Sequence, residues 1–198
     1  MPRLTSLFAI LLLTACGPES PLPAGSIADS DLTDIRPAVD ALDKTTADAR
    51  KARISNIEYD AYIDIAASEE DIIGELSARF DLSDAISDLT LDFTGGTVSS
   101  LRVNGEAISD AYNGYFITLP AEELQLGANA IELEYRRPYG RDGTGLHRFV
   151  DPEDGRTYMH SYLWPYYANR LVPSFDQPSL KATFSLRVRA RRTGAYFP

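Results

Sequence analysis

The 198-residue sequence is poor in the residues that build metal centres and cross-links: it contains one cysteine, Cys16, and two histidines, His147 and His160. A single cysteine cannot form an internal disulfide, so a hydrophobic core alone must hold the fold together. A zinc site needs three or four converging ligands, and neither an H-E-x-x-H pattern nor a cysteine pair occurs. We therefore expect no metal and no other cofactor in this chain.

Signals for nucleotide, nucleic-acid and serine-hydrolase chemistry are also missing. The glycine-rich stretch 140–145 contains no lysine and is not followed by a helical pattern, which favours a turn over a phosphate-binding loop. No G-x-S-x-G nucleophile motif occurs. The net charge of −10 repels phosphate backbones, so we expect no nucleic-acid partner. The acidic excess is typical of a surface that keeps a protein soluble.

No apolar run is long enough to span a bilayer, but residues 1–15 have the features of a secretory signal. Arg3 gives a positive start, an apolar run follows, and small residues precede Cys16. Residues 13–16 also resemble the lipobox of bacterial lipoproteins, whose cysteine is acylated and so holds the protein on a membrane. We expect export to the outer membrane, facing the periplasm, because Gly17 replaces the Asp of an inner-membrane retention signal. The alternative is an ordinary signal peptide with a coincidental cysteine.

Composition divides the rest of the chain into two parts. Residues 16–42 are rich in Pro, Ser, Ala and Asp without a sustained apolar period, and are predicted to be a disordered tether that begins at the lipidated cysteine. Residues 43–198 are enough for one domain with its own core and too few for two.

Within this domain the sequence predicts one short helix followed by strands. Residues 43–53 have Ala-rich spacing with Lys and Arg toward the end, which is typical of a helix. The apolar period then changes to two, with turn signals such as Asn104-Gly105 between the segments. Strands are predicted over residues 57–66, 73–82, 89–93, 98–103, 115–119 and 130–135. Short strands separated by turns indicate an all-β fold, an antiparallel β-saddle or sandwich.

The region after residue 140 concentrates aromatic residues, arginines and turn residues. Residues 151–155 predict a hairpin turn, since they contain Asp-Pro and Asp-Gly. Arg148 and Arg170 stand among aromatics and carboxylates, where buried ion pairing or stacking would suit a guanidinium. Five aromatic residues are expected to form one cluster that packs a wall of the domain or, alternatively, contacts substrate: Tyr158, Tyr162, Trp164, Tyr166 and Tyr167.

Four segments resemble the amino-terminal domain of bacterial aminopeptidase N. Residues 145–155 read G-L-H-R-F-V-D-P-E-D-G, and residues 173–184 read P-S-F-D-Q-P-S-L-K-A-T-F. The family has G-L-H-R-F-V-D-P-x-D-G and P-C-F-D-[EQ]-P-x-L-K-A-T-F at these places. Residues 52–60 and 91–93 fit the family's opening strands, so the resemblance runs in order over residues 45–189.

The resemblance implies a β-saddle that packs on a separate thermolysin-like domain, to which zinc and the catalytic residues belong. The motifs of that second domain are absent here, so we expect no catalytic residue in this chain and no enzyme activity of the chain alone. In the family, the first domain contributes the Gln of T-Q-F-E-P to the substrate pocket. The matching stretch 161–165 reads S-Y-L-W-P, which makes Tyr162 the candidate substrate-binding residue. A phenol cannot reproduce the donor and acceptor pair of an amide, and peptides would be substrates only of the parent protein.

The last residues depart from the family. Relatives continue with a segment like V-x-A-P-x-D-W-x-V-x-S, whereas residues 190–198 read A-R-R-T-G-A-Y-F-P. One permitted codon choice for these residues encodes A-P-D-W-G-V-F-S in a shifted frame, and we hypothesise a frameshift near Ala190. The predicted function is a non-catalytic β-domain that contributes to the substrate-pocket wall and docks a catalytic domain encoded downstream. A stand-alone lipoprotein binding module and a subunit of a split metalloaminopeptidase remain the alternatives.

Overall fold

The computed structural model describes residues 36–191. The predicted signal peptide, Cys16, most of the predicted tether and the end of the proposed frameshift segment lie outside these residues. The helices and strands are α1 (Lys44–Arg53), β1 (Ile54–Asp64), β2 (Asp71–Leu82), β3 (Leu89–Asp92), β4 (Thr97–Val103), β5 (Glu106–Ala107), β6 (Phe116–Leu119), η2 (Ala121–Glu123), β7 (Gly127–Pro138), β8 (Gly145–Val150), β9 (Thr157–Tyr162), η3 (Ala168–Arg170) and β10 (Ala182–Arg189).

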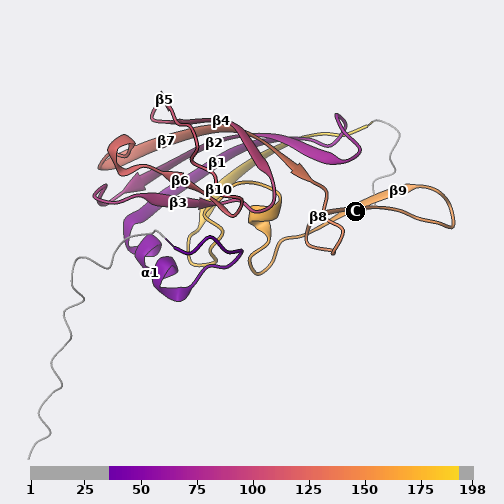
Figure 1. The fold of residues 1–198 in the computed structure, drawn as a ribbon, viewed down its shortest axis with the longest axis horizontal. Helices are drawn as coiled ribbons and strands as arrows, with labels where there is room; N and C mark the ends of the chain where they lie inside the picture. The colour runs from indigo at the N-terminus through magenta and orange to yellow at the C-terminus, as the bar shows by residue number, and fades with distance from the viewer. Residues whose placement is uncertain (1–35, 192–198) are drawn as a thin grey trace, which may run out of the picture. The chain divides into compact units, whose positions relative to one another are not determined.

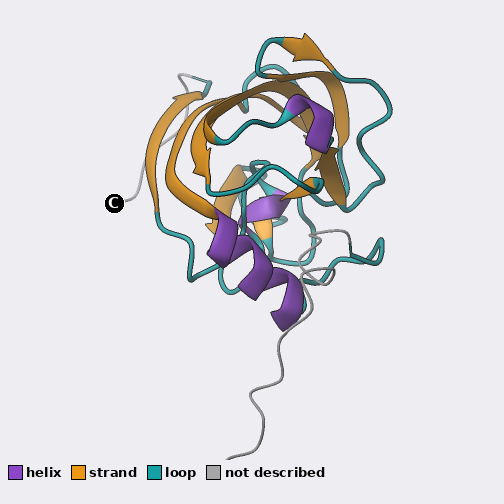
Figure 2. Cartoon of the chain, turned by 90° about the vertical axis from the view of Figure 1, so that its left-hand side faces the viewer, coloured by secondary structure: helices purple, strands orange, loops and turns teal. Residues whose placement is uncertain are grey.

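The strands form one large sheet and two small ones (Figure 1). The large sheet has six strands in the order β10-β1-β2-β7-β4-β5, while β3 pairs with β6 and β8 pairs with β9. One hydrophobic cluster joins the buried side chains of β1, β2 and β7 to those of β3 and β6, among them Leu89, Leu91, Ile117 and Leu119. The large sheet curls in cross-section (Figure 2), and the core lies between it and the β3–β6 pair.

This architecture confirms the predicted all-β class with a short helix near its start. Neighbouring strands of the large sheet are antiparallel except at one edge, where β10 runs parallel to β1 with Phe184 opposite Tyr59. The period-two pattern of β10 suits a parallel or an antiparallel neighbour equally well. The sequence pattern predicts an antiparallel sheet, but the sheet is mixed because β10 joins it in parallel.

Helix α1 begins where the sequence predicts it. Asp43 is the N-cap, and its Oδ1 accepts a hydrogen bond from the backbone N–H of Thr46 at 2.9 Å. Hydrogen bonds from Thr46 hold the pKa of Asp43 below its ordinary value. Arg50 and Arg53 close the helix with positive charge, yet both are buried. Across residues 36–191, no helix is long and apolar enough to cross a membrane.

Strand β1 shows the predicted alternation with one exception. The core-facing side chains are Ile57, Tyr59, Ala61 and Ile63. Asp64 falls on the polar side of this alternation, yet it is only 6% exposed. Its Oδ1 accepts hydrogen bonds from the N–H groups of Ala66 and Ala67, and its Oδ2 lies 2.9 Å from Arg189 Nη1. These partners compensate the carboxylate for the water it loses.

Two turns confirm the local signals that predicted them. Asn104 and Gly105 both have positive φ, 50° and 94°, as a type I′ turn between β4 and β5 requires. In the β8–β9 hairpin, Gly155 has φ 69° and donates its N–H to the Asp151 carbonyl at 2.8 Å. A glycine is favoured there because a side chain at positive φ is strained.

Candidate functional site

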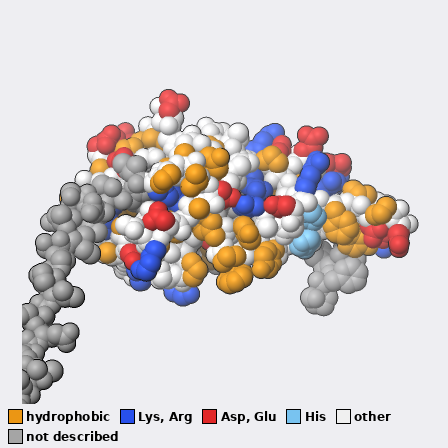
Figure 3. Space-filling view, turned by 60° about the horizontal axis from the view of Figure 1, so that its bottom comes forward, with side chains coloured by type: hydrophobic (Ala, Val, Ile, Leu, Met, Phe, Trp, Pro, Cys, Tyr) orange, Lys and Arg blue, Asp and Glu red, His pale blue; other side chains and the backbone are white. Residues whose placement is uncertain are grey.

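The β8–β9 hairpin and the two residues that follow it leave apolar side chains in solvent. We call this surface the hairpin face, and it consists of Phe149, Val150, Met159, Tyr162, Leu163 and Trp164, each between 36% and 70% exposed. Figure 3 shows hydrophobic side chains beside the two histidines of the hairpin. Because successive residues of a strand point to opposite sides, Phe149 and Tyr162 lie on one side of the hairpin and Val150 and Met159 on the other. Exposed apolar side chains gathered on one element mark an interaction site more often than single scattered ones do.

Tyr162, the candidate substrate-binding residue, lies at the end of β9 opposite Gly145. Its side chain is 48% exposed, and its ring centroid is 6.1 Å from that of Tyr167. Gly145 has no Cβ, and a Cβ there would lie 2.9 Å from the Arg170 backbone oxygen. Glycine at this position therefore allows the start of β8 to lie against η3, close to the Tyr162–Tyr167 contact.

The five aromatic residues that the sequence groups together do not form one cluster. Tyr158 stacks on Phe149 and donates its hydroxyl to Asp154 at 2.8 Å. Trp164 is 70% exposed, whereas Tyr166 turns inward to a buried carboxylate. Tyr158 lies on β9, whereas Trp164 and Tyr166 lie in the loop after it, so the three side chains point in different directions. Only the Tyr162–Tyr167 contact matches the expected cluster.

The two histidines face one another across the hairpin. His147 is paired with His160 in the β8–β9 ladder, and their ring centroids are 4.9 Å apart. The sequence pattern of the two isolated histidines does not by itself predict this contact. The turn at residues 151–155 is the signal that would have found it, because a hairpin folded about residues 153 and 154 pairs position 147 with 160.

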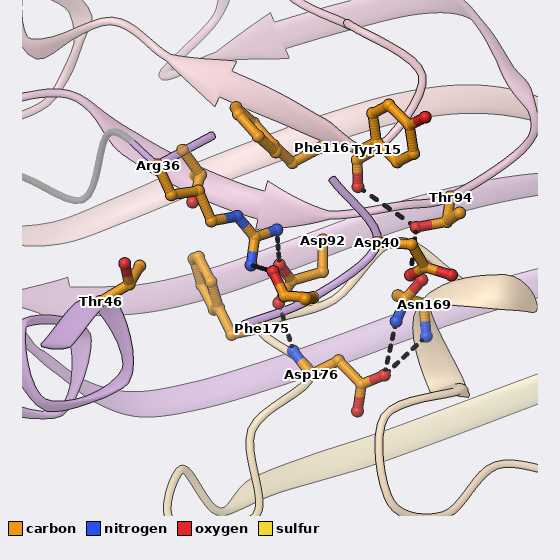
Figure 4. A network of polar contacts seen from close by, with 12 residues as sticks. Arg36, Asp40, Thr46, Asp92, Thr94, Tyr115, Phe116, Asn169, Phe175 and Asp176 are labelled. Atoms are coloured by element: carbon orange, nitrogen blue, oxygen red, sulfur yellow. Dashed lines mark hydrogen bonds and ion pairs between the residues drawn. The ribbon is translucent and has the colours of Figure 1, made fainter. Parts of the chain in front are cut away.

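A buried carboxylate anchors the loop that follows the hairpin. The side chain of Asp92, at the end of β3, is fully buried and forms ion pairs with Arg36 and Arg50. The hydroxyl of Tyr166 and the N–H of Asp176 donate to the same carboxylate at 3.0 and 2.9 Å. Figure 4 shows Arg36 and the backbone of Asp176 directed at Asp92. Because Tyr166 and Asp176 lie ten residues apart in the loop, Asp92 fixes it at two points.

Burial changes the acid–base properties of the groups around this anchor. Burial, and then the charge of Asp92, raises the pKa of Tyr166, so its hydroxyl stays protonated and remains a donor. Burial also raises the pKa of Asp176, an effect that hydrogen bonds from Asn169 oppose. Asn169 donates both its backbone N–H and its side-chain amide to Asp176 Oδ2, each at 3.0 Å. The loop is therefore held by a network of polar groups with little access to water.

The segment before α1 contacts the same loop. Arg36 is 6% exposed, donates to the hydroxyl of Tyr166 at 3.1 Å, and stacks over the ring of Phe116. Asp40 pairs with Arg170 and accepts a hydrogen bond from Thr94 Oγ1 at 3.1 Å. From Arg36 onward, the predicted tether therefore lies against the domain.

The two arginines singled out in the sequence have the partners that were expected. Arg170 forms ion pairs with Asp40 and Asp142, and its guanidinium lies 4.8 Å from the centre of the Tyr167 ring. Arg148 Nη2 lies 3.8 Å from Glu69 Oε2. Both arginines are thus ion-paired and Arg170 also stacks, but the pairs with Glu69 and Asp142 are not buried, because these two carboxylate side chains are 64% and 62% exposed.

Comparison with known proteins identifies relatives of this fold and these motifs. Residues 55–196 match the peptidase M1 N-terminal domain. Aminopeptidase N of Streptomyces lividans is 31% identical over 152 residues, which cover 73% of this chain and 18% of that protein. Probable aminopeptidase 1 of Saccharolobus solfataricus is 25% identical over 138 residues, which cover 69% of this chain and 16% of that protein. The chain therefore spans less than a fifth of either relative.

Solved structures share the fold over about two thirds of the chain. An M1 zinc metallopeptidase from Deinococcus radiodurans matches with a TM-score of 0.52 and 21% identity, over 69% of this chain and 32% of its own. Leukotriene A4 hydrolase from Saccharomyces cerevisiae matches with a TM-score of 0.54 and 17% identity, over 69% of this chain and 23% of its own. Together with the sequence match over residues 55–196, this shows that the chain belongs to the peptidase M1 family as an N-terminal domain of the aminopeptidase N type.

Proposed function

We propose that the chain is the non-catalytic amino-terminal β-domain of an exported, membrane-anchored zinc aminopeptidase. Its hairpin face docks a catalytic domain, and Tyr162 lines the wall of the substrate pocket. The observation that supports docking is the group of partly exposed apolar side chains on β8, β9 and the two residues after them. One relative by fold is a two-domain M1 zinc metallopeptidase bound to L-arginine, which fits a partnership of this kind.

The anchor beneath this surface supports the docking role. An interface residue contributes most when it is held in place before binding, because less conformational entropy is then lost. Hydrogen bonds from Tyr166 and from the N–H of Asp176 to Asp92 fix the loop after the hairpin from inside, while Trp164 stays 70% exposed. Tryptophan is among the residues that most often dominate binding energy at protein interfaces. Trp164 is therefore the side chain that we expect to dominate docking.

The zinc of such an enzyme does not fit the residues of this chain. Across residues 36–191, no three His, Cys, Asp or Glu side chains gather as a metal site requires. The His147–His160 pair supplies two imidazoles, and Nδ1 of His147 already accepts a hydrogen bond from the N–H of Gly143 at 3.2 Å. We therefore assign the metal, the catalytic residues and the turnover of peptides to the partner domain.

Docking is tested with the catalytic part of the Streptomyces lividans relative, prepared without its own N-terminal domain. Titration with the full chain should give a complex, and Trp164→Ala should weaken it by roughly tenfold or more, as expected for a hot-spot residue. Leu126→Ala is the matched control, because Leu126 is 73% exposed outside the hairpin face. Absence of a complex, or equal weakening by both variants, would favour a stand-alone binding module.

The role of Tyr162 is tested in the same complex. Tyr162→Gln should restore the amide typical of the family and change the ratio of kcat/KM between alanyl and leucyl anilides. Trp164→Ala should lower the amount of complex without changing that ratio. An unchanged ratio in Tyr162→Gln would remove Tyr162 from the pocket wall.

The membrane anchor is tested by labelling cells with a fatty-acid analogue. Wild-type protein should carry the label and sediment with membranes, since two or more acyl chains suffice for stable binding. Cys16→Ser should lose the label and become soluble. A soluble, unlabelled wild-type protein would overturn the proposed anchor.

A further inference from the structure

Two Asn-Gly dipeptides, Asn104-Gly105 and Asn113-Gly114, turn the chain sharply within this domain. Both asparagines are exposed. Both glycines have positive φ, 94° and 95°, and a Cβ on either would meet nothing within 4 Å. The two sites therefore match in sequence, in the conformation of the glycine and in their access to water. They differ in how the domain holds the asparagine amide.

The amide of Asn104 is held at both of its polar atoms. Its Nδ2 donates to the Glu123 carbonyl at 2.7 Å and to Asn129 Oδ1 at 2.9 Å. Its Oδ1 accepts a hydrogen bond from the N–H of Ala130 at 2.9 Å. These bonds must break before the amide can turn or its nitrogen can leave, so they protect it from reaction.

The amide of Asn113 is held only at its oxygen. Oδ1 accepts hydrogen bonds from the N–H groups of Tyr115 and Phe116, each at 3.0 Å. Across residues 36–191, neither Asn113 Nδ2 nor the N–H of Gly114 has a hydrogen-bond partner. Two donors on the oxygen draw electron density from the amide carbon and stabilise negative charge that develops on the oxygen. The nitrogen is free to leave, and the Gly114 N–H is free to give up its proton to water.

We propose that Asn113 is a site of self-modification, where the chain converts its own asparagine into aspartate and isoaspartate. The backbone nitrogen of Gly114 attacks Cγ of Asn113 and passes its proton to water. The new N–Cγ bond closes a succinimide ring, and the Cγ–Nδ2 bond breaks as Nδ2 takes up a proton and leaves as ammonia. Water then adds to either of the two ring carbonyls and opens the ring. This chemistry does not depend on docking through the hairpin face.

The two products differ in their effect on the turn. Aspartate keeps an oxygen that accepts the N–H groups of Tyr115 and Phe116. Isoaspartate lengthens the main chain by one carbon and moves the carboxylate away from these donors. The Tyr115 carbonyl accepts hydrogen bonds from the N–H of Phe93 at 3.1 Å and from Thr94 Oγ1 at 3.4 Å, the second of which is drawn in Figure 4. Isoaspartate therefore loosens the turn where it is tied to the residues that follow Asp92.

The test incubates the purified full chain at mildly alkaline pH, with and without urea. Peptide mapping by mass spectrometry follows the mass change that replaces an amide by a carboxyl group at each asparagine. In the folded chain, Asn113 should convert at least about tenfold faster than Asn104, because three hydrogen bonds hold the Asn104 amide. In urea the two rates should become similar, since only the shared dipeptide remains. Equal rates in the folded chain, or conversion of Asn113 in urea alone, would overturn the proposal.

Matched variants locate the reaction and its effect. Each conversion adds a negative charge, so aged wild-type protein should give acidic species on ion exchange. Asn113→Gln should remove these species, because the longer side chain would have to close a larger ring, whereas Asn104→Gln should keep them. The opposite result would place the reaction at the wrong turn.

Urea unfolding separates the two products. Asn113→Asp, which carries aspartate alone, should unfold at the same urea concentration as fresh wild-type protein. Aged wild-type protein in which an isoaspartate methyltransferase labels the peptide containing Asn113 should unfold at a lower concentration. A labelled protein as stable as the fresh one would overturn the proposed loosening of the turn.

Discussion

The carboxylate of Asp92 accepts hydrogen bonds from two buried guanidinium groups, a tyrosine hydroxyl and a backbone N–H. Burying a carboxylate without partners costs free energy, and so does burying a guanidinium group whose carboxylate partner has been removed. Because these partners come from the segment before α1, from α1 itself and from the loop after β9, Asp92 joins three distant parts of the chain.

Asp92→Asn should destabilise the protein by about 3–5 kcal/mol, because it removes the negative charge that Asp92 supplies to the buried guanidinium groups of Arg36 and Arg50. Urea unfolding followed by tyrosine and tryptophan fluorescence measures the change. Asp60→Asn is the control: the Asp60–Arg187 pair is exposed on both sides, so its loss should cost less than about 1 kcal/mol. Similar losses in the two variants would mean that the Asp92 pairs contribute no more than a surface ion pair.

The raised pKa of Asp176 predicts how the stability of the fold changes with pH. Burial raises its native pKa above the ordinary 3.8, so the folded state binds a proton more readily than the unfolded state does. The protonated form favours folding below the ordinary pKa, and this contribution is lost as the pH rises through the native pKa. Asp176→Asn should therefore be more stable than wild type at neutral pH, and the difference should vanish at acidic pH. Urea midpoints measured from pH 3 to pH 7 check this, and a difference that grows toward acidic pH would contradict it.

The β8–β9 hairpin is held against the rest of the domain at its base and is free at its tip. At the base, Gly145 lies against Arg170 with no room for a Cβ; at the tip, a Cβ on Gly155 would meet nothing within 4 Å. Both glycines have positive φ, 65° and 69°. The hairpin is therefore tied to η3 by close backbone packing, while its turn is free of tertiary constraint.

This difference is tested by the same substitution at the two ends. Gly155→Ala should cost about 1 kcal/mol, the strain of an alanine at positive φ. Gly145→Ala should cost about 2–4 kcal/mol, because it adds overpacking against Arg170 to the same strain. Hydrogen exchange should also show faster opening of β8 and β9 in Gly145→Ala than in Gly155→Ala. Equal costs would show that η3 does not constrain the hairpin.

For the domain as a unit, the arrangement of ligands predicts how the protein responds to metal. No three candidate ligand side chains converge among the residues the structure describes, and two imidazoles alone make a weak site. Isothermal titration of the full chain with zinc should therefore show no stoichiometric submicromolar binding, and the chain alone should not hydrolyse aminoacyl anilides. Tight zinc binding with metal-dependent turnover would identify the chain as an enzyme in its own right.

Local chemistry was enough to predict much of the fold. The cap at Asp43, the alternation along β1 and the turns at Asn104-Gly105 and residues 151–155 depend on neighbours within a few residues. A helix cap, a period of two and a turn each depend on residues that are close together in the sequence. The motifs of residues 145–155 and 173–184 were likewise readable without coordinates, and they indicated the family.

The site depended on contacts that local patterns do not encode. Arg36 and Asp92 are 56 residues apart in sequence, yet they share a buried ion pair, and a charged residue within an unpatterned segment predicts only solvation. The parallel pairing of β10 with β1 and the inward turn of Tyr166 beside exposed Trp164 also required the folded chain. The sequence by itself determined six of the strands, β1 to β4, β6 and β7, and the family to which the domain belongs. Tertiary packing alone decided which charges are buried and which apolar rows stay exposed, because burial depends on neighbours brought together from distant parts of the chain.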